Sequence, residues 1–469
     1  MVGGAHPTLF GHLQELNLIL LVRHIILASH RISVKILIFY DFIGSEPMIK
    51  AVRGMKDLLP PETARWHYLE TVARAVFVSY GFQEIRLPLL ERTELFSRSI
   101  GASTDIVEKE MYTFLDRRGE SMTLRPEATA SVVRAFIENR LDQGAEVKKY
   151  FTMGPMFRYE RPQKGRYRQF HQINCEAIGG EAPELDAELI LLLMEIFRRL
   201  KVTGLELVVN SLGCPQCRPA YLMELTALFA RGLRDLCPDC QRRSAANPLR
   251  VFDCKSKTCQ ELLAQVPTIS DKLCDNCQRH EARVLELLDR FQVPYRRNPR
   301  LVRGLDYYTR TAFEVVTTQL GAQDAVAGGG RYNGLIKDLG GPDLPAIGFA
   351  IGQERLATLL SQQDADLLQQ PLLFVAVLGE AARDRAFELV QALRHQGYVA
   401  DLDFTNRSLK AQMTMANRRG AAWVLILGDQ ELADGRAPLK DMRRGEQHLV
   451  SLDTLPQILA DLQPELKGV

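Results

Sequence analysis

The sequence predicts an α+β protein in which a domain built on an antiparallel sheet is followed by a small α/β domain. Three observations support this fold class. Between residues 82 and 178, segments with strand character follow one another without a helix between each, which favours antiparallel pairing. Cysteine pairs then interrupt the strand pattern from residue 211 to 295. After residue 371, strands and helices alternate, which is typical of a mainly parallel sheet.

The composition indicates several folded domains and limits the kind of nucleic-acid contact that is possible. The chain has 469 residues, of which 46% are hydrophobic. Its 59 basic and 57 acidic residues give a formal net charge of +2. This balance excludes a protein that is held on nucleic acid by bulk charge, so any RNA contact must come from local patches.

The first 47 residues form an extension of uncertain status. The stretch from Leu16 to Phe42 is rich in Leu and Ile, but basic and histidine residues interrupt it. It contains no uninterrupted apolar run of the roughly 18 residues that a bilayer span needs, so no membrane association is expected. A targeting presequence is one alternative. A translation artefact or a poorly ordered extension is favoured, because regular patterning begins at Met48.

The first domain is predicted at residues 48–210 and resumes at 296–360. Apolar residues recur at helical spacing over 62–80, and Gly81 then gives a stop signal. A strongly apolar helix is expected at 185–200 and another helix at 353–360. Strands are expected at 82–90, 111–115, 122–124, 149–156, 169–178, 205–210, 312–317 and 346–351.

The region 211–295 is predicted to be an insertion domain that binds zinc. Eight of the nine cysteines occur there as four close pairs, and two thiolates at such spacing are typical of tetrahedral zinc sites in a reducing compartment. One plausible grouping joins the second pair with the fourth and the first with the third, but other groupings stay open, as do redox-labile thiols. The pairs are Cys214/Cys217, Cys237/Cys240, Cys254/Cys259 and Cys274/Cys277.

Residues 361–370 are polar and without pattern, and they are predicted to be a linker to a last domain at 371–469. In that domain, strands are expected at 372–378, 398–402 and 423–427, and helices at 380–396 and 408–419. The last of these helices carries basic residues that would either contact RNA phosphates or form a solvated face. They are Arg407, Lys410, Arg418 and Arg419.

An arginine-rich hairpin indicates that the protein handles a polyphosphate. Five cations and one acid fall between Arg158 and Arg168. Arginines remain charged and bind phosphate oxygens bidentately, so they suit the charge that develops when a nucleotide α-phosphate is attacked. The common glycine-rich phosphate loops are absent from the sequence. A solvated face or an RNA contact is the alternative for this hairpin.

The order of several motifs resembles that of the class II aminoacyl-tRNA synthetases. Phe157-Arg158-Tyr159-Glu160, with the returning strand to Gln172, is similar to their motif 2, and Gly348-Phe-Ala-Ile-Gly352-Gln-Glu-Arg355 to motif 3. Arg303-Gly-Leu-Asp-Tyr-Tyr308 and Leu124-Arg-Pro-Glu127 resemble signatures of the histidyl-tRNA synthetases. The resemblance runs from about residue 48 to 469. It implies a class II catalytic domain, a helical insertion and a C-terminal anticodon-binding domain.

The resemblance also implies an active site. ATP would be bound by Arg158, Arg166 and Arg355, with Arg158 and Arg303 as catalytic residues. Glu127 would bind the ammonium of histidine and Gln172 its carboxylate, while Glu176 and Tyr308 would bind the imidazole. Arg303 would touch both substrates. The complete set expected to bind histidine is Glu127, Ala128, Thr129, Arg158, Gln172, Glu176, Arg303, Tyr307 and Tyr308.

Further expectations follow from the same resemblance. They are a cytoplasmic histidine–tRNA ligase that uses ATP and Mg²⁺ and charges tRNA(His), and a homodimer formed through residues 90–106. A non-catalytic regulatory subunit of ATP phosphoribosyltransferase is the first alternative, although such proteins normally lack the last domain and the ATP-binding arginines. A non-catalytic RNA-binding scaffold is the second.

Overall fold

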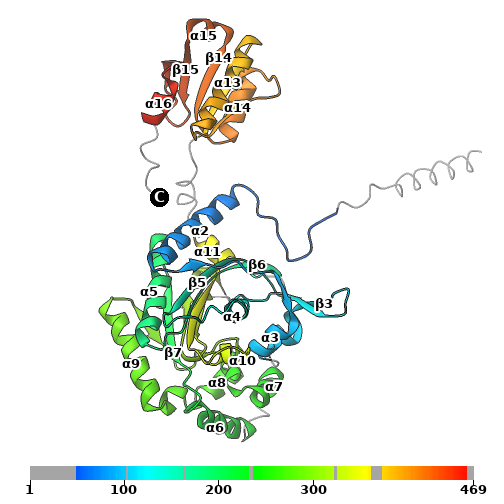
Figure 1. Cartoon of the computed structure of the whole chain (residues 1–469), viewed down its shortest axis with the longest axis vertical. Helices are drawn as coiled ribbons and strands as arrows, with labels where there is room; N and C mark the ends of the chain where they lie inside the picture. The colour runs from blue at the N-terminus through cyan, green and yellow to red at the C-terminus, as the bar shows by residue number, and fades with distance from the viewer. Residues whose placement is uncertain are drawn as a thin grey trace, which may run out of the picture. The chain divides into compact units, whose positions relative to one another are not determined.

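The computed structural model describes residues 49–101, 104–161, 165–231, 236–321, 325–360 and 372–461 (Figure 1). The predicted extension at 1–47 and the predicted linker at 361–370 lie outside these residues. None of the described helices is both long enough and apolar enough to cross a bilayer.

The first domain is built on an eight-stranded sheet with the order β1-β5-β6-β11-β10-β9-β7-β8. Its inner neighbours all pair antiparallel, whereas the two outermost pairs, β1 with β5 and β7 with β8, are parallel. The predicted antiparallel sheet is therefore confirmed. The strands are β1 (Gln83–Glu84), β5 (Lys148–Phe157), β6 (Gln169–Ile178), β7 (Glu206–Ser211), β8 (Tyr295–Arg297), β9 (Thr309–Val316), β10 (Ala325–Arg331) and β11 (Ala346–Gly352).

Three predicted strands are placed differently in the structure. The strand expected at 82–90 is wrong as one element, since β1 covers two residues and the chain then leaves the sheet toward Pro88. The strands expected at 111–115 and 122–124 exist, but they pair in a separate small sheet with β2. That sheet contains β2 (Leu90–Arg92), β3 (Tyr112–Leu115) and β4 (Ser121–Leu124), next to α3 (Thr93–Ser99).

One face of the large sheet is covered by helices, and this packing forms the main core. Helices α2 (Glu62–Ser79), α5 (Pro183–Arg199), α11 (Gln353–Leu359) and the end of α9 (Asp275–Arg290) bury apolar side chains against it. Strand β6 shows the division of faces, because Ile173, Cys175 and Ala177 point into this core. The alternate residues of β6 must then point to the other face, where α4 (Thr129–Glu138) lies.

The insertion between β7 and β8 is helical in the structure, as the resemblance implied. It contains α6 (Arg218–Arg231), α7 (Pro238–Ala246), α8 (Lys257–Leu263) and α9. Its own small core packs cysteines against Tyr221, Leu225 and Val251. Helix α9 belongs to both parts, because Cys277 lies in the core of the insertion while Val284 and Leu288 lie in the main core.

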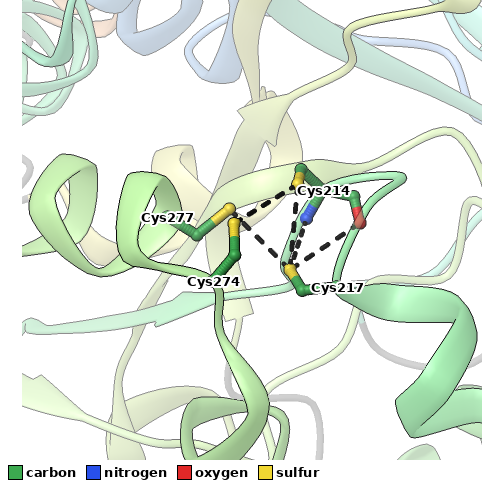
Figure 2. Close-up of side chains that lie close together, drawn as sticks. All are labelled: Cys214, Cys217, Cys274 and Cys277. Carbon is green, nitrogen blue, oxygen red and sulfur yellow. Dashed lines mark hydrogen bonds between the residues drawn. The ribbon is translucent and has the colours of Figure 1, made fainter.

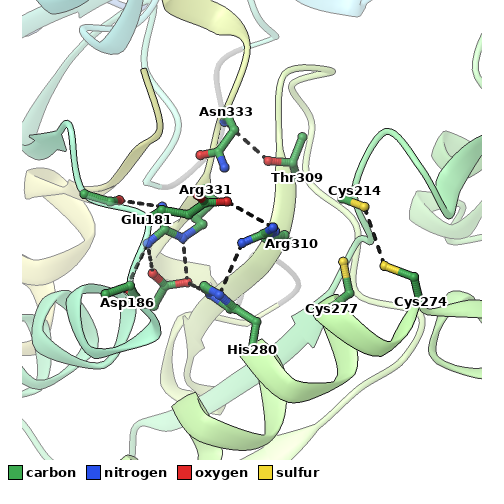
Figure 3. Close-up of polar contacts among 12 residues, drawn as sticks. Glu181, Asp186, Cys214, Cys274, Cys277, His280, Thr309, Arg310, Arg331 and Asn333 are labelled. Atoms are coloured by element: carbon green, nitrogen blue, oxygen red, sulfur yellow. Dashed lines mark hydrogen bonds and ion pairs between the residues drawn. The ribbon is translucent and has the colours of Figure 1, made fainter. Parts of the chain in front are cut away.

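A buried charged network ties α9 to the sheet (Figure 3). Arg331 of β10 and Asp186 of α5 are both 0% exposed and form an ion pair of 2.5 Å. His280 of α9 contacts the same carboxylate at 2.8 Å, and Arg310 of β9 lies 3.4 Å from the other ring nitrogen of His280. The Arg331 guanidinium also donates to the carbonyls of Gly180 and Ala182. Four elements are therefore joined through buried groups that pair with one another.

The last domain has a five-stranded sheet with the order β13-β12-β14-β15-β16. The prediction of a mainly parallel sheet needs correction, since β12 pairs parallel with β13 and β14, but β14, β15 and β16 pair antiparallel. Two hairpin strands after residue 435 carry no strong apolar pattern, which explains why they were missed. The elements are β12 (Leu372–Leu378), α13 (Ala381–His395), β13 (Ala400–Leu402), α14 (Leu409–Arg418), β14 (Ala421–Gly428), α15 (Asp429–Asp434), β15 (Arg436–Asp441), β16 (Gln447–Ser451) and α16 (Leu455–Asp461).

Candidate active site

A cavity of about 310 Å³ brings together most of the side chains that the sequence motifs singled out. Strands β6, β10 and β11, the loop from Arg303 to Tyr308 and the segment before α4 supply its lining. The predicted site residues that line it are Glu127, Thr129, Arg158, Arg166, Gln172, Arg303, Tyr307, Tyr308 and Arg355. Two predicted residues, Ala128 and Glu176, are almost fully buried and do not belong to the described lining.

The polar face of β6 forms one wall of the cavity. Phe170, Gln172 and Asn174 alternate along the strand and line the cavity. The Gln172 Oε1 and Asn174 Nδ2 atoms are buried and have no hydrogen-bond partner among the described residues. Buried polar atoms are rarely left unpaired, so a polar ligand is expected to complete these contacts.

Glu127 is held at the beginning of α4. Its two carboxylate oxygens accept hydrogen bonds from the amides of Thr129 (2.7 Å) and Ala130 (2.8 Å). Burial raises the pKa of Glu127, while the two amide hydrogen bonds act in the opposite direction. The amides at a helix N-terminus favour a carboxylate there, and its remaining lone pairs face the cavity that it lines.

Glu176 lies directly behind the cavity wall. Its Oε1 accepts a hydrogen bond of 2.6 Å from the hydroxyl of Thr129, and its Oε2 accepts one of 2.6 Å from Tyr332. Burial raises the pKa of Glu176 to about 8. Both partner residues line the cavity, so Glu176 fixes the orientation of two hydroxyl groups on its surface.

Arg158 lies at the end of β5, where the hairpin with β6 begins. Its amide donates to the carbonyl of Arg168 (2.9 Å), which closes the predicted hairpin. The Arg158 Nε donates to the carbonyl of Pro126 (2.9 Å), and the guanidinium lies 5.3 Å from the centre of the Phe170 ring. These contacts hold a fixed positive charge at the cavity surface.

Arg303 lies against the glycine tract of β10. Its guanidinium forms an ion pair with Glu314 of β9, and its Nε is buried without a hydrogen-bond partner among the described residues. A Cβ atom at Gly328 would overlap this guanidinium. The glycine therefore provides the space that Arg303 occupies, and one donor of Arg303 stays available to a ligand.

The two other predicted ATP-binding arginines lie at the rim. Arg166 forms an ion pair with Glu160, within the same hairpin. Arg355 of α11 donates to the carbonyls of Ala325 (2.5 Å) and Gly165 (3.4 Å). The hairpin, β10 and α11 are thus connected at the cavity through Arg355.

Three tyrosines with neighbouring rings line the cavity. The ring of Tyr307 lies 4.8 Å from that of Tyr308 and 5.7 Å from that of Tyr332. Burial raises the pKa of each of these tyrosines, so their hydroxyls stay protonated and can donate hydrogen bonds. They offer a polar but uncharged surface.

Several residues of this site were not predicted. Phe170 and Asn174 could have been found, because they share the alternation of Gln172 and Glu176 along β6. Glu314 gives no sequence signal, since its role comes from an ion pair with Arg303. Tyr332 joins the site through its hydrogen bond to Glu176, which depends on the tertiary fold.

The eight paired cysteines form two separate clusters. One contains Cys214, Cys217, Cys274 and Cys277 (Figure 2), and the other Cys237, Cys240, Cys254 and Cys259. The grouping put forward as plausible from the sequence is therefore wrong. The reason is topological: β7 and β8 pair side by side, so the chain enters and leaves the insertion at one place and its outer pairs meet there, while the inner pairs meet each other.

Comparison with known proteins gives the family. A family described as "Histidyl-tRNA synthetase" matches residues 54–356, and one described as "Anticodon binding domain" matches residues 373–462. The first match spans more than half of the chain. The chain belongs to the histidyl-tRNA synthetase family. The resemblance read from the motifs is thereby confirmed.

Relatives of the histidyl-tRNA synthetase family match almost over their full length. A "Histidine--tRNA ligase" of Oleidesulfovibrio alaskensis is 53% identical over 414 residues, which are 88% of this chain and 99% of the relative. One from Syntrophotalea carbinolica is 52% identical, covering 88% and 98%. The apo structure of histidyl-tRNA synthetase from S. aureus is 37% identical with a TM-score of 0.74, covering 88% of this chain and 99% of that one. In this family member, the cavity on the sheet is the candidate active site.

Proposed function

We propose that this histidine–tRNA ligase activates histidine with ATP in the cavity and then transfers it to tRNA(His). In the first step, the histidine carboxylate attacks the α-phosphate of ATP, a bond to pyrophosphate breaks, and histidyl-adenylate forms. In the second, the 3′-terminal ribose hydroxyl of the tRNA attacks the histidyl carbonyl and AMP leaves. The observation that carries this proposal is the meeting of Arg158, Arg303 and Arg355 around one cavity with unpaired polar atoms.

The arginines would contact different parts of ATP. Arg158 would bind the α-phosphate from the end of β5, while Arg166 and Arg355 would bind the outer phosphates and the adenine side. Arg303 would touch the histidine carboxylate and the α-phosphate, since its buried Nε has no partner among the described residues. Fixed charges that need no reorganisation stabilise the charge that develops in the transition state.

The histidine pocket would be formed by acids, polar side chains and a tyrosine around the cavity. Glu127 and Thr129 would bind the ammonium, and Gln172 the carboxylate. Tyr308 and Glu176 would read the imidazole nitrogens, where Glu176 has only the lone pairs left over from its bonds to Thr129 and Tyr332. A site built to hydrogen-bond a ring nitrogen rejects side chains that lack it, because buried polar groups would then stay unpaired. Ala128 and Tyr307 would shape the pocket.

Magnesium would neutralise part of the charge of the ATP phosphates, and the residues around the cavity would supply few ligands to it. Two of the acids at the cavity are already engaged, because Glu160 pairs with Arg166 and Glu314 with Arg303. The ion would therefore be held mainly by ATP oxygens, which suits a cation that binds few protein carboxylates.

Histidine-dependent exchange of labelled pyrophosphate into ATP tests the activity directly. The expected result is exchange with histidine and none without it, and loss of exchange in Arg303→Ala with the circular dichroism spectrum unchanged. Arg296→Ala is the control, because Arg296 pairs with Glu206 on the surface. Absence of exchange from folded parent protein would instead favour a regulatory subunit, or a scaffold if tRNA binding persists. Against the regulatory alternative stands the C-terminal domain match at 373–462.

Structural zinc would occupy both cysteine clusters. In the first cluster, Sγ atoms lie 3.8 Å apart between Cys214 and Cys217 and between Cys214 and Cys274, and 3.9 Å apart between Cys217 and Cys277. A tetrahedron with Zn–S bonds of about 2.3 Å has edges of about 3.8 Å, which is far longer than a disulfide. The second cluster has a matching separation of 3.7 Å between Cys237 and Cys254.

Metal analysis of protein purified under reducing conditions tests the zinc proposal. The two clusters predict two zinc ions per chain, and a finding of none would overturn it. Zinc sites of this kind need reduced thiolates, so we place the protein in a reducing compartment, the cytoplasm.

A homodimer would form through the segment 90–106 and the small sheet beside it. The register of that sheet places Leu90 and Phe114 on one face, and both are exposed large apolar side chains (41% and 47%). Exposed apolar surface of this kind is typical of an interface. Light scattering after size exclusion should give twice the mass of the chain, and Phe114→Arg should lower it; a monomeric parent would contradict the proposal.

The last domain would bind the anticodon of tRNA(His). Arg407, Lys410 and Arg418 line a hollow of about 390 Å³ on α14. Arg419 instead pairs with Asp401, so it is the weakest of the four predicted phosphate contacts. Lys410→Ala should raise the KM for tRNA without changing pyrophosphate exchange, because phosphate contacts position the RNA and take no part in activation.

A further inference from the structure

We infer that Arg218 and the metal of the first cysteine cluster position Tyr308 in the histidine pocket. The inference rests on the zinc site and the pocket proposed above, and it assigns to the insertion domain a role in amino-acid binding. Arg218 is a positioning residue, because it acts through the main chain of Tyr308.

Arg218 connects the cluster to the pocket directly. It follows Cys217 and is the first residue of α6. Its Nε donates to the carbonyl of Leu212 (3.1 Å), and its NH2 group donates to the carbonyl of Tyr308. One guanidinium thus joins the chain just before the first cysteine to the main chain of a pocket residue.

The turn before Cys214, formed by Leu212 and Gly213, is hydrogen-bonded to the main chain of Arg310, two residues after Tyr308. The Leu212 amide donates to the carbonyl of Arg310 (2.6 Å), and the Arg310 amide donates to the carbonyl of Gly213 (2.8 Å). Gly213 has a φ of 67°, and a Cβ atom there would lie 2.9 Å from the Sγ of Cys217. Only glycine fits this turn, which brings the thiolates and the main chain of Arg310 together.

Arg310 shows that these contacts hold the backbone in an uncommon conformation. Its φ is 48°, which is unusual for a residue with a side chain. Such a conformation persists only where the surroundings enforce it. Here the turn bonds the main chain of Arg310, while the Arg310 side chain contacts the buried His280 and the exposed Glu181 (Figure 3).

Tyr308 is the residue on which these contacts converge. Tyr308 is 7% exposed, lines the cavity and belongs to the same apolar cluster as Cys214 and Cys217. A metal that fixes the cysteines therefore fixes the turn, Arg218 and the carbonyl of Tyr308 in one unit. Without these contacts, Tyr308 would occupy a range of positions. A hydrogen bond from Tyr308 to the imidazole needs one defined position, so histidine would bind more weakly.

The test is kinetic and uses the full chain. Arg218→Met keeps the length of the side chain and removes both hydrogen bonds, so the KM for histidine in pyrophosphate exchange should rise roughly tenfold, with the KM for ATP and the zinc content unchanged. Arg218→Lys, which keeps one donor, should restore part of the loss. Arg300→Met is the matched control, because Arg300 also donates to two carbonyls, those of Leu263 (3.1 Å) and Ala264 (2.9 Å), away from the cavity.

Two results would overturn the inference. One is an unchanged KM for histidine in folded Arg218→Met; the other is an equal rise in Arg300→Met. For the metal, Cys274→Ser should lose one zinc ion and raise the KM for histidine as Arg218→Met does, while an unchanged KM after that loss would refute the role of the metal. If the parent contains no zinc, the zinc proposal and the metal's part of this inference both fail, while the role of Arg218 is still decided by the effect of Arg218→Met on the KM for histidine.

Discussion

Gly348 of β11 stands directly opposite Glu176 of β6, and a methyl group on Gly348 would overlap the Glu176 carboxylate. The absence of a side chain at one strand position thus makes room for a buried acid on its neighbour. Because Glu176 bonds Thr129 and Tyr332, the small residue at this position in motif 3 shapes the pocket through Glu176.

Gly348→Ala is expected to destabilise the catalytic domain by about 1–3 kcal/mol, because overpacking forces the carboxylate or the strand to move. Urea unfolding followed by fluorescence measures this. Gly352→Ala on the same strand is the control, since its nearest contacts would be at an ordinary 3.7 Å. Equal stability of the two variants would show that Glu176 can move at no cost.

Gly328→Ala is expected to lower pyrophosphate exchange by about 100-fold, because the new methyl group displaces the Arg303 guanidinium and a small misplacement is costly in a preorganised site. Steady-state exchange measures this effect. Arg296→Ala, which removes an exposed ion pair with Glu206, should stay close to the parent. Full activity of Gly328→Ala would mean that Arg303 does not need its observed position.

Asp186→Ala is expected to destabilise the protein by about 3–5 kcal/mol, because it leaves the fully buried Arg331 without its counter-charge. Thermal and urea unfolding measure the loss. Glu206→Gln, which removes an exposed partner of Arg296, should change stability little. A small effect of Asp186→Ala would imply that water or another acid takes over the pairing.

The raised pKa of Glu176 predicts that the stability of the protein depends on pH. Burial raises its pKa to about 8 in the folded protein, above the ordinary value of 4.5. The folded state therefore binds the proton of Glu176 more tightly than the unfolded state does. The contribution of this protonation to the free energy of unfolding is fully present below pH 4.5 and is lost as the pH rises through about 8. Glu176→Gln cannot ionise, so the parent should lose stability relative to this variant by up to about 1.4 kcal/mol per pH unit within that window. Urea unfolding of both proteins from pH 5 to 9 tests this; parallel profiles would contradict it.

The sequence predicts the parts of this site that depend on local periodicity. Gln172 and Glu176 share a face because strand residues alternate, and Arg158 lies at a hairpin end because polar turn residues follow β5. Strand β10, which contains the glycine tract 328–330, was not among the predicted strands. Glycine has low strand propensity, and only the close neighbours of the tract, such as Phe349 beside Gly329, explain its use there.

The grouping of the cysteines shows the limit of such reasoning. Spacing identifies which thiols act in pairs, but which pairs meet depends on where the chain enters and leaves the insertion. The same applies to Arg218, whose place after Cys217 gives no sign that its guanidinium reaches Tyr308. These contacts join residues that are far apart in sequence, so local patterns do not contain them.

Because one cysteine cluster is nested inside the other in sequence, the two clusters are completed in a fixed order during synthesis. Cys214 and Cys274 are 60 residues apart, whereas Cys237 and Cys254 are 17 apart and lie between them. A ribosome that has just released Cys259 has already supplied every thiolate of the inner site, while the outer site still lacks half of its own. The shorter loop also closes at a lower entropic cost. Metal uptake would therefore proceed from the inside outward, and the turn that supports the amino-acid pocket would be the last part of the insertion to be locked.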